Sequence, residues 1–126
     1  MIHPKNVSAR SGVPIPAEAF GEIDHTAVYW LGGAGFLLNC RGKIVLIDPV
    51  LLTREDDASV SEFGLKLKIR YPLRPEAIPR LDGVLYTHPD AEHLGPRTAT
   101  ALTRLSPRYY GTLAVFERLV RLGVPH

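Results

Sequence analysis

Two apolar runs separated by only two residues constrain the fold of this chain more than any other feature. Gly35-Phe-Leu-Leu-Asn-Cys40 and Lys43-Ile-Val-Leu-Ile-Asp48 each have the length and composition of a β-strand. Arg41-Gly42 joins them, with glycine where a tight turn needs it. The sequence therefore predicts an antiparallel hairpin. Because both runs are almost continuously apolar, it also predicts that the hairpin is buried on both faces.

Further strands and helices are indicated on both sides of this hairpin. Residues 26–31 are rich in strand-forming residues and are followed by Gly32 and Gly33. Residues 81–87 also have the composition of a strand. Pro96 suits the first turn of a helix, and Gly123 suits the residue just after the end of one. These signals predict an α/β fold with a mixed (α+β) sheet. The remaining expected elements are a helix over 96–105, a short strand over 108–110 and a helix over 113–122.

Two segments lack a regular pattern. Residues 1–25 are rich in proline and glycine, and we expect an irregular N-terminal arm there, with a short helical turn at 16–20, before a domain over 26–126. Residues 51–80 form a connection long enough to be functional. Within it, 65–71 alternates apolar and basic residues, which fits either an edge strand or a lid or loop facing the substrate. A basic stretch of this connection fits either a solvated edge or contact with an anionic substrate. It consists of Lys66, Lys68, Arg70 and Arg74.

Composition excludes several classes of function. The chain has 15 basic and 13 acidic residues, a balance that predicts neither nucleic-acid nor membrane-surface binding. No apolar run approaches the roughly 20 residues that span a bilayer, and the N-terminus lacks the apolar core of a secretory signal. Cys40 is the single cysteine, so an internal disulfide is excluded and a reducing compartment is indicated. We therefore expect a cytoplasmic protein.

Four potential metal ligands fall within six positions directly after the strand predicted at 81–87. They are His88, Asp90, Glu92 and His93. Alternate side chains of an extended chain share a face, so His88 and Asp90 can form one half-site, and Glu92 and His93 can form another in the following turn. Imidazole and carboxylate ligands suit zinc, manganese or iron. Glu92 is the candidate catalytic residue, because a carboxylate there can also move protons. The alternative is an ordinary polar surface loop.

Several motifs, in order along the chain, resemble those of the metallo-β-lactamase superfamily. The run Thr87-His-Pro-Asp-Ala-Glu-His93 is similar to the superfamily's metal-binding signature, His-x-His-x-Asp-His. Trp30-Leu-Gly-Gly-Ala-Gly-Phe36 resembles its first hairpin, and the strand ending at Asp48-Pro49 resembles the one that ends in its aspartate. Together with Gly123-Val-Pro125, these motifs most resemble the subgroup related to L-ascorbate-6-phosphate lactonase.

The resemblance implies the N-terminal half of an αββα sandwich that binds two divalent metal ions. His88 and Asp90 would hold the first ion, Glu92 and His93 the second, and Asp48 would steady the ligand loop without binding metal. Asp90 stands where the signature usually has its second histidine, which changes the charge of that ligand. Glu92 stands where it usually has aspartate, which lengthens the side chain by one methylene. The ligands that the superfamily takes from its second half have no counterpart here, which predicts a truncated chain.

The implied function is metal-dependent hydrolysis of an ester, lactone or phosphoester by a metal-bound hydroxide, with a small-molecule substrate that is either anionic or neutral. We expect the chain to be a weak catalyst or inactive by itself. An uncovered apolar sheet face would favour homo-oligomer formation or pairing with a complementary C-terminal half. The alternative function is a non-catalytic remnant of the fold that acts in binding or assembly.

Overall fold

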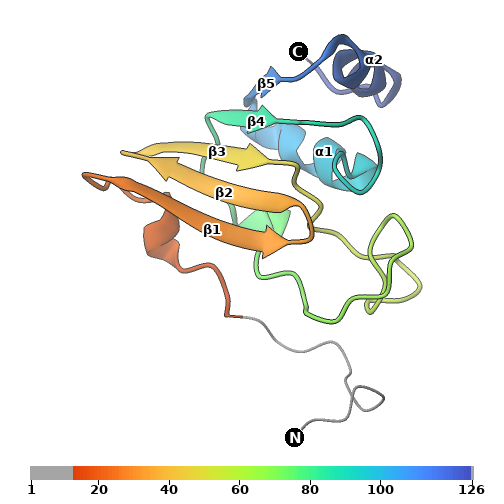
Figure 1. Ribbon diagram of the computed structural model, residues 1–126, viewed down its shortest axis with the longest axis horizontal. Helices are drawn as coiled ribbons and strands as arrows, with labels where there is room; N and C mark the ends of the chain where they lie inside the picture. Colours follow the sequence, from red (N-terminus) through yellow and green to blue (C-terminus); the bar gives the residue numbers. More distant parts are fainter. Residues whose placement is uncertain (1–12, 126) are drawn as a thin grey trace, which may run out of the picture.

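The computed structural model describes residues 13–125, which form a five-stranded mixed sheet with helices packed against it (Figure 1). Residues 1–12 of the expected N-terminal arm, and His126, lie outside the described residues. The strands are β1 (Thr26–Gly32), β2 (Gly35–Cys40), β3 (Lys43–Ile47), β4 (Gly83–Leu85) and β5 (Arg108–Tyr110), and the α-helices are α1 (Pro96–Leu102) and α2 (Leu113–Arg121). Short 3-10 helices are η2 (Ala17–Phe20), η3 (Pro75–Ala77) and η4 (Thr103–Leu105). The expected α/β class with a mixed sheet is confirmed.

The order of the strands in the sheet follows the chain, β1-β2-β3-β4-β5. The β1–β2 and β2–β3 pairs are antiparallel, which confirms the predicted hairpin, whereas β3–β4 and β4–β5 are parallel. Parallel strands end at the same edge of a sheet, so the residues after β3 and β4 emerge side by side. The Asp48 backbone N–H donates to the Leu85 carbonyl at 3.0 Å and holds these two strand ends together.

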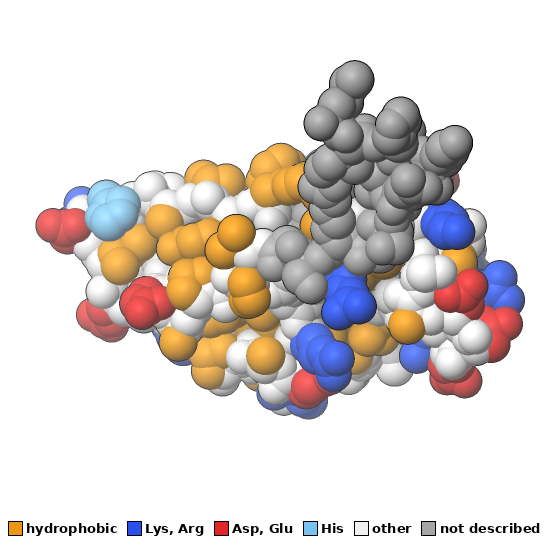
Figure 2. Space-filling view, turned by 90° about the horizontal axis from the view of Figure 1, so that it is seen from below, with side chains coloured by type: hydrophobic (Ala, Val, Ile, Leu, Met, Phe, Trp, Pro, Cys, Tyr) orange, Lys and Arg blue, Asp and Glu red, His pale blue; other side chains and the backbone are white. Residues whose placement is uncertain are grey.

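The two faces of the sheet differ in burial. Leu37, Ile44 and Leu46 are fully buried on the inner face, in one core cluster with residues of α1 and α2. On the outer face, Val28 and Trp30 of β1 remain 60% and 53% exposed. Figure 2, a view onto the β1 edge of the sheet, shows hydrophobic side chains gathered on that side of the molecule. The prediction that the hairpin is buried on both faces is wrong, because on its outer face Phe36 of β2 is 37% exposed and Val45 and Ile47 of β3 are only half-buried.

Buried Asn39 ties β2 to the segment before the sheet. Its side-chain amide donates to the carbonyls of Ala19 (2.9 Å) and Gly21 (2.7 Å), and its Oδ1 accepts from the Gly42 N–H at 2.8 Å. The η2 turn, predicted at residues 16–20, is thereby fixed against the core. Of the described part of the expected arm, Ala19 and Phe20 are thus buried in the core.

The connection between β3 and β4 contains no strand at 65–71. Single bridges instead pair Thr53 with Ser61 and Val60 with Lys66, which folds the connection into a compact loop. The strand expected at 81–87 is shorter, and the helix expected to reach residue 105 is α1 followed by η4. No helix in the described part of the chain has the length and hydropathy needed to cross a bilayer.

Candidate metal centre

Asp48 stands at the structural centre of the candidate site. It follows β3 directly and adopts a left-handed backbone with φ 46°, a conformation that aspartate tolerates better than most residues. Its side chain is only 4% exposed. The carboxylate accepts hydrogen bonds from the Thr87 backbone N–H at 2.7 Å and from the Thr87 hydroxyl at 2.5 Å. Asp48 therefore fixes the start of the loop that carries the predicted ligands.

The same carboxylate holds the end of this loop through His93. The His93 Nδ1 lies 2.9 Å from Asp48 Oδ2, and the side chain of His93 is 27% exposed. Nδ1 donates to this carboxylate in the tautomer that carries the imidazole proton on Nδ1. The lone pair of Nε2 is then available. This carboxylate–histidine arrangement is the one that orients imidazole ligands of metals, and it is what the role predicted for Asp48 requires.

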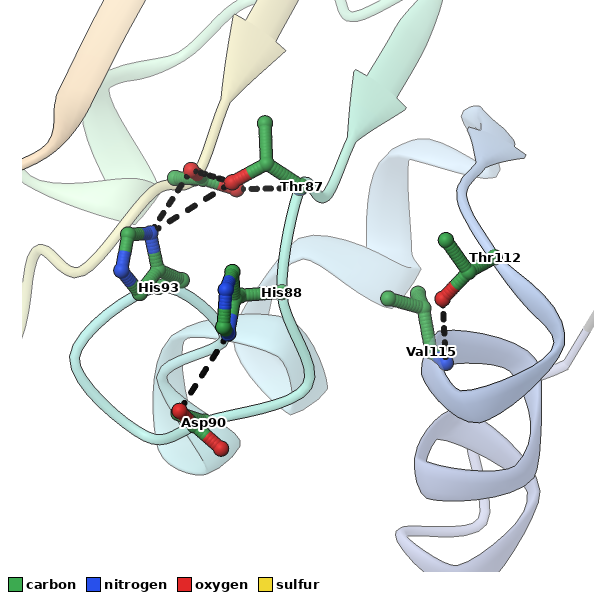
Figure 3. A network of polar contacts seen from close by, with 7 residues as sticks. Thr87, His88, Asp90, His93, Thr112 and Val115 are labelled. Carbon is green, nitrogen blue, oxygen red and sulfur yellow. Dashed lines mark hydrogen bonds and ion pairs between the residues drawn. The ribbon is translucent and has the colours of Figure 1, made fainter.

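His88 stacks on His93 and, like it, has Nδ1 beside a carboxylate. The two rings are stacked, with centroids 4.9 Å apart and an angle of 27° between their planes. The His88 Nδ1 is 3.2 Å from Asp90 Oδ2, and both side chains are more than half exposed. Figure 3 shows both histidines on the loop after β4, each with a ring nitrogen directed at an oxygen partner. Both imidazoles therefore present Nε2 as the unused nitrogen.

The predicted ligands are only partly brought together. His88, Asp90 and His93 form a connected group, whereas Glu92 is exposed and makes no hydrogen bond or ion pair with any described residue. Within residues 13–125, no three His, Cys, Asp or Glu side chains are placed close enough to hold a metal ion together. The structure thus supplies two oriented imidazoles, with Asp90 serving as the partner of His88. The ligand roles of Asp90 and Glu92 stay predictions.

Two residues that position the loop were missed in the sequence. Thr87 directly precedes the motif, and its two bonds to Asp48 could have been suspected from that place alone. Glu62 lies far away in sequence, yet its carboxylate accepts from the Arg97 N–H (2.7 Å), the Thr98 N–H (3.2 Å) and the Thr98 hydroxyl (2.5 Å). Glu62 therefore caps the first turn of α1, just after the ligand loop. No local pattern indicates such a contact.

A buried phenol adjoins this region without adding charge to it. The Tyr86 side chain is 1% exposed, and its hydroxyl has no hydrogen-bond partner among the described residues. Burial raises the pKa of Tyr86 well above its usual range. The phenol is therefore neutral at every physiological pH, and the strand end beneath Thr87 stays apolar.

Comparisons with known proteins place these features in a context. No model of a protein family matches the chain. A UPF0173 metal-dependent hydrolase of Polynucleobacter asymbioticus is 32% identical over 109 residues, which cover 86% of this chain and 34% of that protein. Uncharacterized proteins of Mycobacterium bovis and Mycobacterium tuberculosis are each 29% identical over 96% of this chain and 33% of their own length. The chain spans about a third of the curated relatives it matches, and over that third it is similar to a protein named as a metal-dependent hydrolase.

Proposed function

We propose that this chain contributes the first part of the metal site of a metal-dependent hydrolase acting on an ester, lactone or phosphoester. The observation that carries the proposal is the stacked pair of His88 and His93, each with Nδ1 beside a carboxylate and Nε2 unused. The similarity to a protein named as a metal-dependent hydrolase supports it.

The residues present fit a divalent metal such as zinc, manganese or iron. The two Nε2 atoms suit all three ions, and the exposed carboxylates of Asp90 and Glu92 on the same loop would have to turn toward the ion to add oxygen ligands. A bound metal would lower the pKa of a water molecule and polarise the bond to be cleaved. Glu92 is exposed on the same loop, and we assign it the role of general base in this proposal.

The proposed substrate class rests on two further motifs of the sequence. The runs Trp30–Phe36 and Gly123–Pro125 favour the subgroup related to L-ascorbate-6-phosphate lactonase. Phosphorylated lactones are therefore the first substrates to test. Because the described residues provide only two oriented imidazoles, a complete site needs ligands from another chain or from a longer form of the protein. We expect the 126-residue chain alone to be weakly active at best.

Metal binding by the purified chain tests this proposal. We expect Zn²⁺ or Mn²⁺ titrated into the protein to bind, and the double variant His88→Ala, His93→Ala to lose this binding, because both imidazole ligands are removed. Isothermal titration calorimetry gives the affinity, and elemental analysis of dialysed protein gives the stoichiometry. His25→Ala is the matched control, because His25 also has Nδ1 near a carboxylate, 3.0 Å from Asp24, but lies at the start of the sheet. Equal affinities in the double variant and the wild type would refute the site.

A second candidate function, assembly, is favoured by the outer face of the sheet. Strand pairing places Val28 opposite Leu38 and Trp30 opposite Phe36, and these apolar side chains share the outer face. Among the residues paired on this face, charge is confined to Lys43 and Arg108 at one end of the strands. A second copy of the chain, related by a two-fold axis, could therefore cover the uncharged part of the face without bringing like charges together. Metal-free protein with an intact fold would favour this function over hydrolysis.

Self-association should therefore depend on the outer face. We expect sedimentation velocity to show a concentration-dependent dimer for the wild type, and mainly monomer for Val28→Lys, because the interface would bury an ammonium group without a partner. Val120→Lys is the matched control, since Val120 on α2 is 56% exposed and Val28 is 60% exposed. A monomeric wild type, or equal behaviour of the two variants, would rule out this interface.

A further inference from the structure

The long connection between β3 and β4 encloses a cleft of about 650 Å³. This volume lies in the range of small-molecule sites, about 300–1,000 Å³. Leu51, Leu67 and Leu73 are among the apolar residues that line it. None of the lining residues is a predicted metal ligand, so the cleft is a feature separate from the histidine loop. Both follow the ends of neighbouring parallel strands, and Figure 1 shows the two loops at the same end of the sheet.

The charged residues that line the cleft have a net charge of +1. Arg70 and Arg74 line it together with Glu76. Neither arginine makes an ion pair with another of the described residues. A guanidinium group offers paired donors that match the oxygens of a carboxylate or a phosphate. The lining therefore complements one negative charge, and Glu76 disfavours a second.

The walls of the cleft are held in place by contacts within the loop and to its neighbours. The Leu67 N–H donates to the Ser59 carbonyl at 2.8 Å, and Glu62 bonds to the first turn of α1. Tyr71, which also lines the cleft, packs under the tip of the β1–β2 hairpin, where a Cβ added to Gly32 would lie 3.4 Å from its ring. Burial raises the pKa of Tyr71 to about 12, so its phenol remains a neutral hydrogen-bonding group. A cleft that exists before a ligand arrives loses less free energy on binding.

We infer that this cleft binds an amphipathic monoanion, a molecule with an apolar chain and one negatively charged headgroup. The headgroup lies at Arg70 and Arg74, and the chain lies against the leucines. The inference does not depend on the metal site, because the two share no residue.

Calorimetry and NMR with two probes test the inference on the full chain. Decanoate supplies a carboxylate and dibutyl phosphate supplies a phosphodiester, so the pair of probes separates the two headgroups. Acetate and decanol serve as the headgroup-only and chain-only controls. We expect at least one probe to bind in the presence of EDTA, to bind more weakly as salt increases, and to shift amide signals of residues 51–76.

Substitutions at the charged residues should change affinity in opposite directions. The double variant Arg70→Gln, Arg74→Gln should weaken binding at least about tenfold, whereas Glu76→Gln should tighten it by about two- to threefold. Arg121→Gln on α2 is the matched control and should leave affinity unchanged. Ala58→Phe should weaken the binding of both probes, because the added ring would fill part of the cleft where the apolar chain lies.

Two results would overturn the inference. One is an affinity for both probes that the arginine substitutions leave unchanged. The other is a set of amide shifts confined to β1–β3, which would place decanoate on the exposed outer face of the sheet instead. If binding persists under EDTA while metal binding by the histidines fails, the proposed hydrolase function falls and the cleft remains.

Discussion

Replacing Asp48 with alanine should lower the free energy of unfolding by about 3–5 kcal/mol. The substitution removes the acceptor of two hydrogen bonds from Thr87 and of one from His93. It leaves the Thr87 N–H without its partner beside a buried strand end. It also places alanine in a left-handed backbone, at φ 46°, which costs about 1–2 kcal/mol more than a right-handed conformation. Urea denaturation followed by circular dichroism measures the loss.

Two variants separate these contributions. Asp48→Asn tolerates the left-handed backbone and keeps one oxygen acceptor, so we expect about half the loss seen with alanine. Asp90→Ala removes the exposed partner of His88 and should change stability by no more than about 0.5 kcal/mol. A loss below about 1 kcal/mol in Asp48→Ala would show that the carboxylate does not hold the loop.

Asp48→Ala should also weaken metal binding, by about 10- to 100-fold, because the His93 ring would lose the contact that fixes its orientation. The ¹⁵N shifts of His93 report which ring nitrogen carries the proton. In the wild type we expect the proton on Nδ1, and in the variant a mixture of both tautomers. An unchanged tautomer would contradict the role of Asp48 as a positioning residue.

Replacing Glu62 with alanine should lower the free energy of unfolding by about 2 kcal/mol. Glu62 accepts hydrogen bonds from Arg97 and Thr98 at the start of α1, where the first N–H groups of a helix have no partner within it. Pro96 and Gly95 supply no side-chain cap, so Glu62 from the distant loop serves instead. Its loss frees both the start of α1 and the loop that lines the cleft.

Three further variants test this prediction. Glu62→Gln retains an oxygen acceptor but no charge, and should lose about half as much stability as Glu62→Ala. Glu55→Ala removes a carboxylate 3.6 Å from the Arg97 guanidinium, a surface contact of small effect. Gly95→Ala should lose no more stability than Glu62→Ala, because its Cβ would lie 2.7 Å from Glu62 Oε2 and the carboxylate would have to shift away from the start of α1. Equal stability of Glu62→Ala and Glu55→Ala would contradict the capping role.

Local signals in the sequence were sufficient for most of the fold. The Arg41-Gly42 turn predicted the hairpin, and Pro96 and Gly123 marked helix ends that the structure confirms. These predictions were correct because turn geometry and helix termination depend on a few neighbouring residues. The prediction of burial on both faces failed because apolar composition permits burial but does not supply the layer that would cover the face.

The candidate site was predictable only in part. The spacing of His88, Asp90, Glu92 and His93 indicated a ligand loop, since these residues are neighbours in sequence. Which of them contact one another was not readable, because a loop of this length allows many side-chain directions. The structure pairs Asp90 with His88 and leaves Glu92 exposed.

The sequence by itself determined the order of the elements and the position of the ligand loop after β4, because both depend on short-range patterns of apolar residues, glycine and proline. Only the tertiary structure decided that Asp48 would bond both ends of that loop, 39 and 45 residues away, and that Glu62 would cap α1 from 35 and 36 residues away. The physical reason is that contacts between distant segments depend on how strands pair and helices pack. Parallel pairing of β3 with β4 brings Asp48 beside Thr87, and no local preference of either residue specifies that arrangement.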